Sequence, residues 1–357
     1  MKIGARPWAR RMRRCCALLL LASLPACGGG LQLTKINSDQ KKPNNVWVFF
    51  TVQKGEEPIG GLAAEDFEIY EDGAKVSSFE SQQVILNPEV AAVMYTLLLL
   101  DVSGSITESG QIEPLVDAAE LFVERVGKTQ KVAVYAFDGA KELHPIVPFT
   151  TTEQSLRGGL EGLRKYKPKD PSTNLHGAVV QGLETLKRDL DRDKKPLKFG
   201  TLVVFSDGAD RAARVSREEM QDAIAKPDYE HYELFAIGIG EKAELEQAQL
   251  SDIGRNGTEE GQDRAKVKDA FDRIAGRIEA HTKRFYLLSY CTPARKGEHS
   301  VRIDVNTEKV PSKGSLEYNF KADGFGPPPA CNPEREPAFD LDNVVPVIDL
   351  DDPDSDQ

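Results

Sequence analysis

Three separated segments of the chain carry the hydroxyl and carboxylate side chains that hard cations prefer. In the first, Asp101, Ser103 and Ser105 occupy alternate positions directly after an apolar run. The second places Thr173 before a helical pattern, and the third places Asp207 after another apolar run. Oxygen ligands without sulfur or imidazole select Mg²⁺ or Mn²⁺ over Zn²⁺. If the three segments converge, these side chains predict a divalent-cation site.

Each segment also has an ordinary structural explanation. Asp, Ser and Gly are common turn residues, and a Thr that precedes a helix is a common N-cap. On this alternative interpretation the five residues stabilise the fold and bind no metal. Their coincidence at three strand or helix ends favours the metal site.

The elements that must position these residues alternate between strand and helix patterns. The unbroken apolar runs at residues 94–100 and 201–205 are typical of strands buried on both faces of a parallel sheet. Amphipathic patterns at residues 112–126 and 267–280 predict helices that cover the sheet. The alternation predicts an α/β domain with a doubly wound, mostly parallel sheet over residues 93–290. In such sheets, ligands bind beyond the carboxyl ends of the strands.

Taken together, the three segments resemble the metal-ion-dependent adhesion site of von Willebrand factor type A (VWA) domains, whose motif is DxSxS, then Thr, then Asp. The resemblance covers about 200 residues and implies a Rossmann-like VWA fold. It implies that the hydroxyls of Ser103, Ser105 and Thr173 bind the metal directly. Asp101 and Asp207 would then act partly through bridging water. A Glu or Asp of a protein partner would fill the last coordination position.

Both flanks of the α/β domain show the alternation of strands. Residues 45–92 contain short strand patterns and an Asp72-Gly73 turn, and residues 291–325 resume the alternation. Because each flank is too small to be stable alone, we expect the two to form one small all-β unit. The segment 60–73 also resembles the β-segment before the VWA domain in a group of exported bacterial proteins.

The N-terminus has the features of a secretory signal. Residues 1–26 hold six basic side chains, no acidic one, and the ten-residue apolar run 15–24. A helix of that length covers about 15 Å, half of a bilayer core, so it cannot span a membrane. The sequence Leu24-Pro25-Ala26-Cys27 resembles the bacterial lipobox, which implies cleavage before a lipid-modified Cys27. The alternative is an ordinary signal peptide with a chance cysteine.

The resemblance to a lipobox predicts a location in the cell envelope. Residues 27–44 would then be the lipid anchor, carrying chains such as palmitate, and a polar spacer. The Gly after Cys27 implies, by the sorting rule of this class of lipoprotein, transport to the outer membrane of a diderm bacterium. The domain would lie on its periplasmic face or on its surface.

Two cysteines and the tail complete the prediction. Cys15 and Cys16 would leave with the signal, so Cys291 and Cys331 remain beside the modified Cys27. An exported compartment is oxidising, so these two either form a disulfide or stay as free thiols. The tail, residues 326–357, begins with a Pro-rich stretch and is strongly acidic thereafter, which predicts disorder.

Several functional classes are disfavoured. The net charge of −11 opposes nucleic-acid binding. The five histidines have no paired metal-ligand spacing, and no GxSxG motif is present, so the sequence does not predict an enzyme. We therefore expect a membrane-anchored lipoprotein that binds a protein partner through Mg²⁺ or Mn²⁺. The alternatives are a metal-independent structural envelope protein and, less favoured, an undetected hydrolase.

Overall fold

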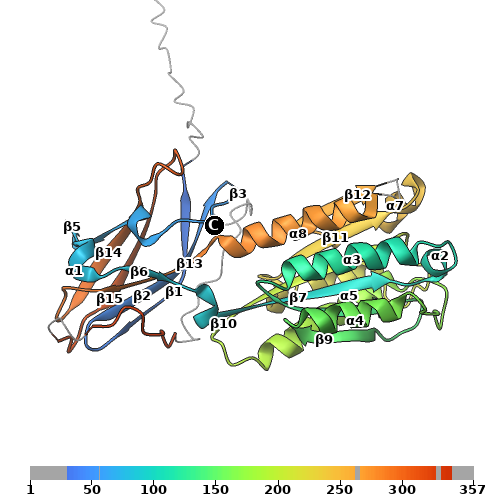
Figure 1. Ribbon diagram of the computed structural model, residues 1–357, viewed down its shortest axis with the longest axis horizontal. Helices are drawn as coiled ribbons and strands as arrows, with labels where there is room; N and C mark the ends of the chain where they lie inside the picture. Colours follow the sequence, from blue (N-terminus) through green and yellow to red (C-terminus); the bar gives the residue numbers. More distant parts are fainter. Residues whose placement is uncertain (1–29, 56, 262–265, 327–330, 340–357) are drawn as a thin grey trace, which may run out of the picture.

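The computed structural model describes residues 30–55, 57–261, 266–326 and 331–339. Within these ranges a β-sandwich and an α/β unit lie side by side along the long axis of the molecule (Figure 1). None of the helices described is both long and apolar enough to cross a bilayer. The predicted signal and Cys27 fall outside the described residues, as do residues 340–357 of the tail.

The α/β unit is built on a six-stranded sheet. Its strands are β7 (Ala92–Asp101), β8 (Lys131–Phe137), β9 (His144–Thr150), β10 (Leu197–Ser206), β11 (Glu233–Ile239) and β12 (Gly257–Gly261). Their order in the sheet is β12-β11-β10-β7-β8-β9, and only the β8–β9 pair within it is antiparallel. The predicted fold class, a doubly wound and mostly parallel sheet, is confirmed.

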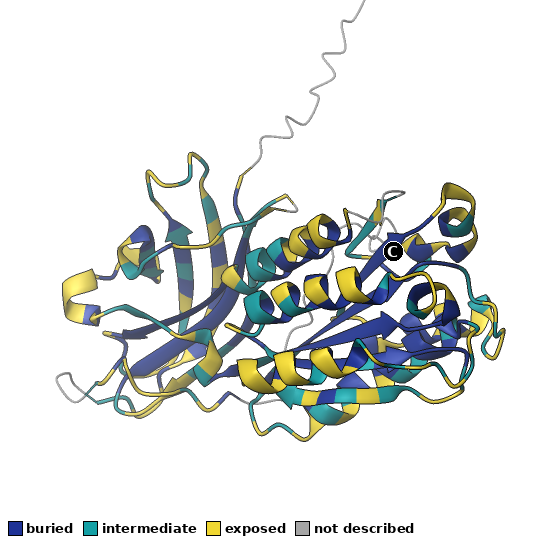
Figure 2. Ribbon diagram, turned by 45° about the vertical axis from the view of Figure 1, so that its right-hand side comes forward, coloured by how far each residue is buried: buried dark blue, intermediate teal, exposed yellow. Residues whose placement is uncertain are grey.

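Helices cover both faces of this sheet, with their apolar stripes inward and their outer faces exposed (Figure 2). One face is covered by α3 (Ile112–Val126), α4 (Glu153–Leu163) and α8 (Val267–Lys283). The other is covered by α5 (Leu175–Asp191), α6 (Arg217–Ile224) and α7 (Lys242–Ala248). The short α2 (Gly104–Thr107) lies at the end of the unit farthest from the sandwich (Figure 1). Single 3₁₀ turns occur at Pro227–Tyr229 and Leu250–Asp252.

The β-sandwich consists of two antiparallel sheets. The first contains β1 (Gln32–Lys41), β2 (Asn45–Lys54), β3 (Glu57–Pro58), β6 (Val84–Leu86) and β13 (Phe285–Cys291). The second contains β4 (Phe67–Glu71), β5 (Ala74–Lys75), β14 (Glu298–Val305) and β15 (Gly314–Lys321). Because β2 pairs with β13, and β4 with β14, each sheet combines strands from both sides of the α/β unit. Short helical segments lie at Ala64–Asp66, α1 (Ser78–Ser81) and Pro88–Val90.

The predicted boundary of the α/β domain at residue 290 is wrong, because β13 belongs to the sandwich. It lies between β2 and β6 in the first sheet. Its sequence looks like a strand of a parallel sheet because both of its faces are buried. Tyr286 and Leu288 face the second sheet of the sandwich, whereas Phe285 and Leu287 pack toward the α/β unit.

The predicted spacer at residues 27–44 is also wrong, since most of it forms β1. This strand pairs with β2 along its whole length. A register shift between Lys35 and Asn37 interrupts the alternation and leaves both Ile36 and Asn37 buried. The interrupted alternation of apolar and polar residues therefore does not reveal β1 in the sequence. Its strand structure depends on backbone hydrogen bonds to β2.

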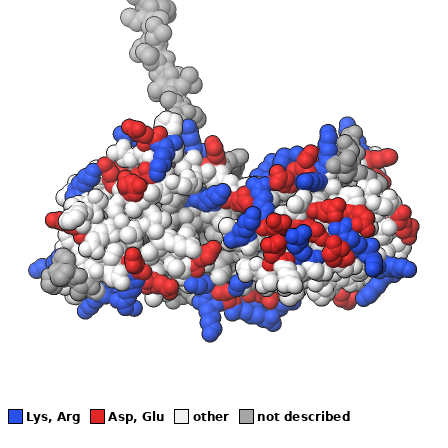
Figure 3. All heavy atoms as spheres, in the orientation of Figure 1, with Lys and Arg blue, Asp and Glu red and all other residues white. Residues whose placement is uncertain are grey.

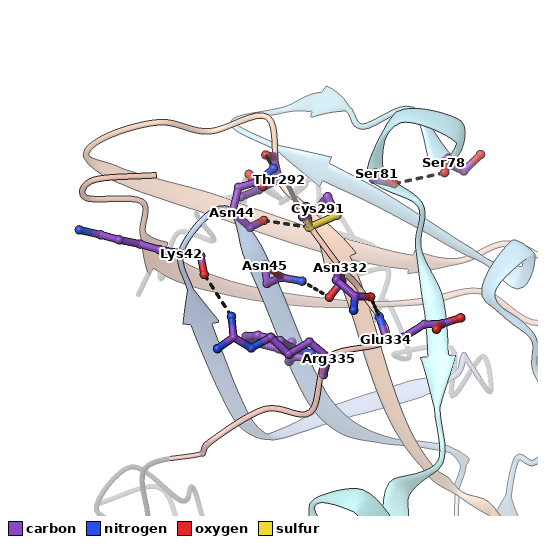
Figure 4. Close-up of a disulfide and its surroundings, with 12 residues drawn as sticks. Lys42, Asn44, Asn45, Ser78, Ser81, Cys291, Thr292, Asn332, Glu334 and Arg335 are labelled. Carbon is purple, nitrogen blue, oxygen red and sulfur yellow. Dashed lines mark hydrogen bonds between the residues drawn. A yellow bond between two sulfur atoms is a disulfide. The ribbon is translucent and has the colours of Figure 1, made fainter. Parts of the chain in front are cut away.

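Part of the tail predicted to be disordered is held in place. Residues 331–339, here called the strap, begin with a disulfide between Cys331 and Cys291 (Figure 4). Next to it, Nδ2 of Asn45 donates a 2.5 Å hydrogen bond to the carbonyl of Asn332 (Figure 4). The prediction failed for the strap because acidic composition carries no information about a covalent bond to a distant strand.

The rest of the strap covers the face of β2 that points away from the second sheet. Nε1 of Trp47 donates a 2.8 Å hydrogen bond to the carbonyl of Arg335. At the end of the strap, Phe339 is buried and its ring packs edge-on against Phe49, with 6.3 Å between centroids.

A small apolar cluster joins the sandwich to the α/β unit. Trp47, Phe49 and Phe285 of the sandwich pack with Ala92 and Leu197, the first residues of β7 and β10. The sandwich therefore covers the amino ends of the parallel strands. Their carboxyl ends, where ligands bind in such sheets, lie at the opposite end of the molecule, beside α2 (Figure 1).

Candidate metal centre

Two central strands of the α/β sheet deliver carboxylates to the same edge. Asp101 is the last residue of β7, and Asp207 directly follows β10. The two strands are parallel neighbours. The chain leaves β7 toward α3 on one face of the sheet and leaves β10 toward α6 on the other. This divergence is a topological switch point, where an open α/β sheet has room for a ligand.

The Asp101 loop is organised by its own side chains. The backbone N–H of Ser103 donates a 2.9 Å hydrogen bond to Oδ1 of Asp101. This turn leads into α2 and brings the hydroxyl oxygens of Ser103 and Ser105 to 3.1 Å from each other. Gly104, between the serines, donates its N–H to the carbonyl of Pro171 at 2.9 Å. A Cβ on Gly104 would lie only 3.0 Å from Cβ of Pro171, so this close approach of two backbones favours glycine.

Asp207 completes a connected group of oxygen atoms. Its Oδ1 accepts a 2.9 Å hydrogen bond from the hydroxyl of Ser105. Oδ2 of Asp101 accepts a 2.8 Å hydrogen bond from the hydroxyl of Ser206. Asp101, Ser103 and Asp207 are all buried. The structure thus brings together four of the five predicted metal-site residues through side-chain contacts.

Thr173 is tied through its backbone to the loop that follows Asp207. It is 4% exposed, and its carbonyl accepts 2.9 Å hydrogen bonds from the N–H groups of Arg211 and Ala212, in the loop after Asp207. The hydrogen bond from Gly104 to Pro171, two residues before Thr173, ties the same segment to the Asp101 loop. Thr173 therefore lies between the segments that carry the other four residues.

The two carboxylates repel each other. The pKa of Asp101 is raised well above the usual range for an aspartic acid. The main cause is its complete burial, and the second is the nearby charge of Asp207. Hydrogen bonds from Ser103 and Ser206 oppose this rise. A divalent cation would offset the repulsion, and the hydroxyls of Ser103 and Ser105 would supply neutral ligands beside it. The donor set therefore fits a hard cation.

The donor set also excludes some other kinds of metal site. Within the described ranges, no group of three or more His, Cys, Asp or Glu side chains is placed to hold a metal ion. A metal ion at these strand ends would therefore need hydroxyl oxygens among its ligands. Such neutral ligands leave most of the charge of a divalent ion uncompensated.

Sequence reasoning missed Ser206, which contacts Asp101, and it missed Asp138 and Asp210, which contact the segment around Thr173. Ser206 holds Asp101 from the neighbouring strand. Asp138 directly follows β8, as Asp207 follows β10, and it is fully buried. The signal that could have found Asp138 is therefore its position after a buried strand at the same sheet edge. Asp210 has no such signal, because it lies inside a loop.

The outer surface carries charges of both signs. On the described part of the face in Figure 3, acidic and basic side chains are interspersed over the α/β unit. Arg125, for example, lies 2.7 Å from Asp272, and Arg164 lies 2.7 Å from Asp117. Exposed pairs of this kind stabilise a protein only slightly. This face therefore has no separate basic field of the kind that attracts a phosphate backbone.

One protein-family model matches part of the chain. The model of the von Willebrand factor type A domain family matches residues 96–209, which include all five predicted metal-site residues. No curated protein matches the chain.

Solved structures of low sequence identity overlap with the chain. The vWF domain of the type V pili tip protein Mfa5 from Porphyromonas gingivalis is 12% identical, with a TM-score of 0.43, over 54% of this chain and 97% of that one. Proximal thread matrix protein 1 from the mussel byssus, with a zinc-occupied MIDAS motif, is 17% identical, with a TM-score of 0.41, over 52% and 48%. Manganese-loaded TRAP protein from Plasmodium vivax is 14% identical, with a TM-score of 0.42, over 72% and 100%.

The chain spans about half the length of the mussel protein it matches. The family match and the observed strand order agree on the central unit. The α/β unit has a von Willebrand factor type A-like fold, and the model of that family matches its residues 96–209.

Proposed function

We propose that this protein is a metal-dependent binding module that captures a protein partner through an exposed carboxylate of that partner. The observation that carries the proposal is the connected oxygen cluster of Asp101, Ser103, Ser105 and Asp207 at the switch point of the sheet. Turn and cap roles explain each residue separately. They do not explain why two buried carboxylates and two hydroxyls meet at one point.

The residues divide into two roles in this proposal. The hydroxyls of Ser103, Ser105 and Thr173 would bind Mg²⁺ or Mn²⁺ directly, while Asp101 and Asp207 would hold its water molecules. The bound ion would supply a Lewis-acidic position for a carboxylate oxygen. The protein itself would bind and orient the partner without catalysing a reaction. Of the five residues, Ser105 is the exposed one, so the cluster opens to solvent on its side.

We further propose that the module is held on the cell envelope by a lipid on Cys27, after removal of residues 1–26. Shortly after Cys27 the chain enters β1 of the sandwich. The oxygen cluster lies at the other end of the molecule, beside α2 (Figure 1). An anchor at Cys27 would therefore join the membrane to the sandwich and not to the end of the α/β unit that carries the cluster.

Calorimetry with Mg²⁺ and Mn²⁺ tests the metal site. The wild-type protein should release or absorb heat on binding, and Asp101→Ala and Ser105→Ala should lose most of that signal. Ser105→Ala is the safer variant, because Ser105 is exposed and Asp101 is buried. Ser315→Ala, on the exposed face of β15 in the sandwich, is the matched control and should bind like wild type. Equal heats in wild type and Ser105→Ala would refute the site.

Capture from envelope extract tests the partner. Immobilised wild-type protein should retain a protein with Mg²⁺ present and lose it with EDTA, whereas Ser105→Ala should retain none. Capture that is insensitive to EDTA would favour the metal-independent scaffold. Incorporation of labelled palmitate into wild type but not Cys27→Ser would test the anchor separately.

A further inference from the structure

The segment that carries Thr173 is held between two loops of the α/β unit. On one side, the N–H of Asn174 donates a 3.0 Å hydrogen bond to the carbonyl of Asp138, in the loop after β8. On the other side, the loop after β10 donates two backbone hydrogen bonds to the carbonyl of Thr173. The position of this segment is therefore decided by contacts outside it.

The side chain of Asp138 forms one bridge to the segment. It is fully buried, and its Oδ2 accepts a 2.8 Å hydrogen bond from the N–H of Lys169. Its Oδ1 accepts a 2.8 Å hydrogen bond from Ala140 in its own loop and lies 3.3 Å from Nε2 of His144. One carboxylate thus joins the loop after β8 to the beginning of the Thr173 segment.

Asp210 forms a similar bridge from the opposite side. Its side chain is 3% exposed, and its Oδ2 accepts a 2.8 Å hydrogen bond from the N–H of His176 in the first turn of α5. Its Oδ1 accepts a 2.7 Å hydrogen bond from Ala213 in its own loop. Asp138 and Asp210 therefore bracket the segment from Lys169 to His176, each with one oxygen on the segment and one on its own loop.

The space between the segment and the Asp138 loop is tightly filled. A Cβ on Gly139 would lie 2.0 Å from the hydroxyl oxygen of Ser172, so a larger residue at position 139 would force a neighbouring side chain to move. At the surface, Arg214 donates hydrogen bonds to the carbonyl of Gly139 and to Oδ2 of Asp170. Arg214 therefore links the Asp138 loop to the segment at the surface.

We propose that Asp138 and Asp210 are positioning residues that hold the Thr173 hydroxyl ready for a metal ion that neither of them binds. This inference rests on the proposed metal-dependent function. The chemistry requires carboxylates, because both oxygens of each residue face N–H donors and a carboxylate only accepts hydrogen bonds. An amide in either place would turn an N–H group toward another N–H group. Asparagine is therefore not a conservative replacement here.

Asp138→Asn and Asp210→Asn test the proposal, with Asp193→Asn as the matched control. Asp193 also accepts a backbone N–H, from Lys195, and also receives side-chain donors, from Lys131 and Tyr95. These two side-chain donors pair with each other in register near the amino ends of β7 and β8, whereas the cluster lies at the carboxyl ends. All three variants exchange a carboxylate that accepts a backbone N–H for an amide, but Asp193 lies away from the Thr173 segment and also pairs with Lys131.

Two measurements are made on the full chain at a temperature where circular dichroism shows every variant folded. Calorimetry should show Mg²⁺ affinity at least about tenfold weaker in Asp138→Asn and Asp210→Asn, and unchanged in Asp193→Asn. Hydrogen exchange in EDTA should be faster at Lys169 in the first variant and at His176 in the second. Wild-type Mg²⁺ affinity in both variants, or equal weakening in the control, would overturn the proposal.

The outcomes separate this inference from the proposed function. If wild type binds neither Mg²⁺ nor Mn²⁺, the metal-dependent function fails, and the exchange rates alone decide whether the two carboxylates hold the segment. Wild-type rates of hydrogen exchange at Lys169 and His176 in the two variants would then also overturn the claim that Asp138 and Asp210 hold the segment. Should the buried substitutions prevent folding, Arg214→Ala breaks a bridge between the same loops from the surface. It should weaken Mg²⁺ binding in the same direction by a smaller factor, and an unchanged affinity would count against the proposal.

Discussion

The hydroxyl of Ser105 donates a 2.9 Å hydrogen bond to Oδ1 of Asp207, a residue 102 positions later in the chain. Ser105 lies in α2, after β7, and Asp207 directly follows β10. The two strands are parallel neighbours, so their carboxyl ends meet at one edge of the sheet. The contact shows how the sheet brings two segments that are distant in the chain into direct side-chain contact.

Mg²⁺ should raise the free energy of unfolding of the wild-type protein. An ion that binds only the folded state stabilises it by about 2.7 kcal/mol when its free concentration is 100 times Kd. Urea unfolding with Mg²⁺ and with EDTA measures this difference. The gain should be largely lost in Ser105→Ala and kept in Ser315→Ala. A gain of the same size in Ser105→Ala would place the ion elsewhere on the protein.

Ser206→Ala should destabilise the protein even without metal. The Ser206 hydroxyl donates to Oδ2 of Asp101 inside the buried cluster, and its loss leaves that carboxylate oxygen without this donor. An unsatisfied buried group of this kind costs about 1–3 kcal/mol. Urea unfolding in EDTA measures the change. Wild-type stability in Ser206→Ala would mean that water or another side chain replaces the hydroxyl.

Glu71 should make the stability of the wild-type protein depend on pH. Burial in the sandwich raises its pKa, and a 2.7 Å hydrogen bond from the hydroxyl of Thr292 opposes the rise only in part. The folded state therefore holds the proton more tightly than the unfolded state. Glu71 then disfavours folding progressively as the pH rises from the ordinary glutamic acid pKa to the raised one.

Urea unfolding of wild type and Glu71→Gln over that pH range checks this prediction. The difference in unfolding free energy between the two proteins should shift in favour of Glu71→Gln as the pH rises. The nearby His299 and Asp72 also act on Glu71, with opposite effects on its pKa, so the comparison must be between the two proteins at each pH. Parallel pH profiles would refute the assigned cause.

Breaking the disulfide should loosen the strap over β2. Cys291 and Cys331 close a loop of 40 residues, and loss of such a cross-link lowers stability by about 2–4 kcal/mol. Trp47 reports on the strap directly, because its indole N–H is bonded to Arg335. In a Trp8→Phe background it is the sole tryptophan of the chain.

Fluorescence of Trp47 in that background, with and without Cys331→Ser, tests the strap. Emission should shift to longer wavelength in Cys331→Ser as water reaches the indole. Phe339→Ala, which removes the buried ring at the end of the strap and keeps the disulfide, separates packing from the covalent link. An unshifted emission spectrum in Cys331→Ser would show that the hydrogen bonds and Phe339 hold the strap without the disulfide.

The local pattern of apolar residues was sufficient to predict the fold class of the α/β unit. Strands with both faces buried, such as β7 and β10, are apolar along their whole length, and the helices between them carry one apolar stripe. These patterns depend on each element's own surroundings, so they are visible in a single sequence. The fold class could therefore be predicted. For the same reason β13 was assigned to the wrong unit, because a strand between two apolar layers has the same pattern in a sandwich.

The sequence by itself determined the residue types of the candidate site and the sheet edge at which they should meet, because DxSxS and Asp207 each follow a buried strand. Tertiary structure alone decided that β1 is a strand, that residues 331–339 form a strap, and that Asp138 and Asp210 bracket the Thr173 segment. Each of these features depends on a partner far away in the chain. A hydrogen bond or disulfide to a distant residue leaves no periodic trace in the local sequence, so only the folded chain reveals it.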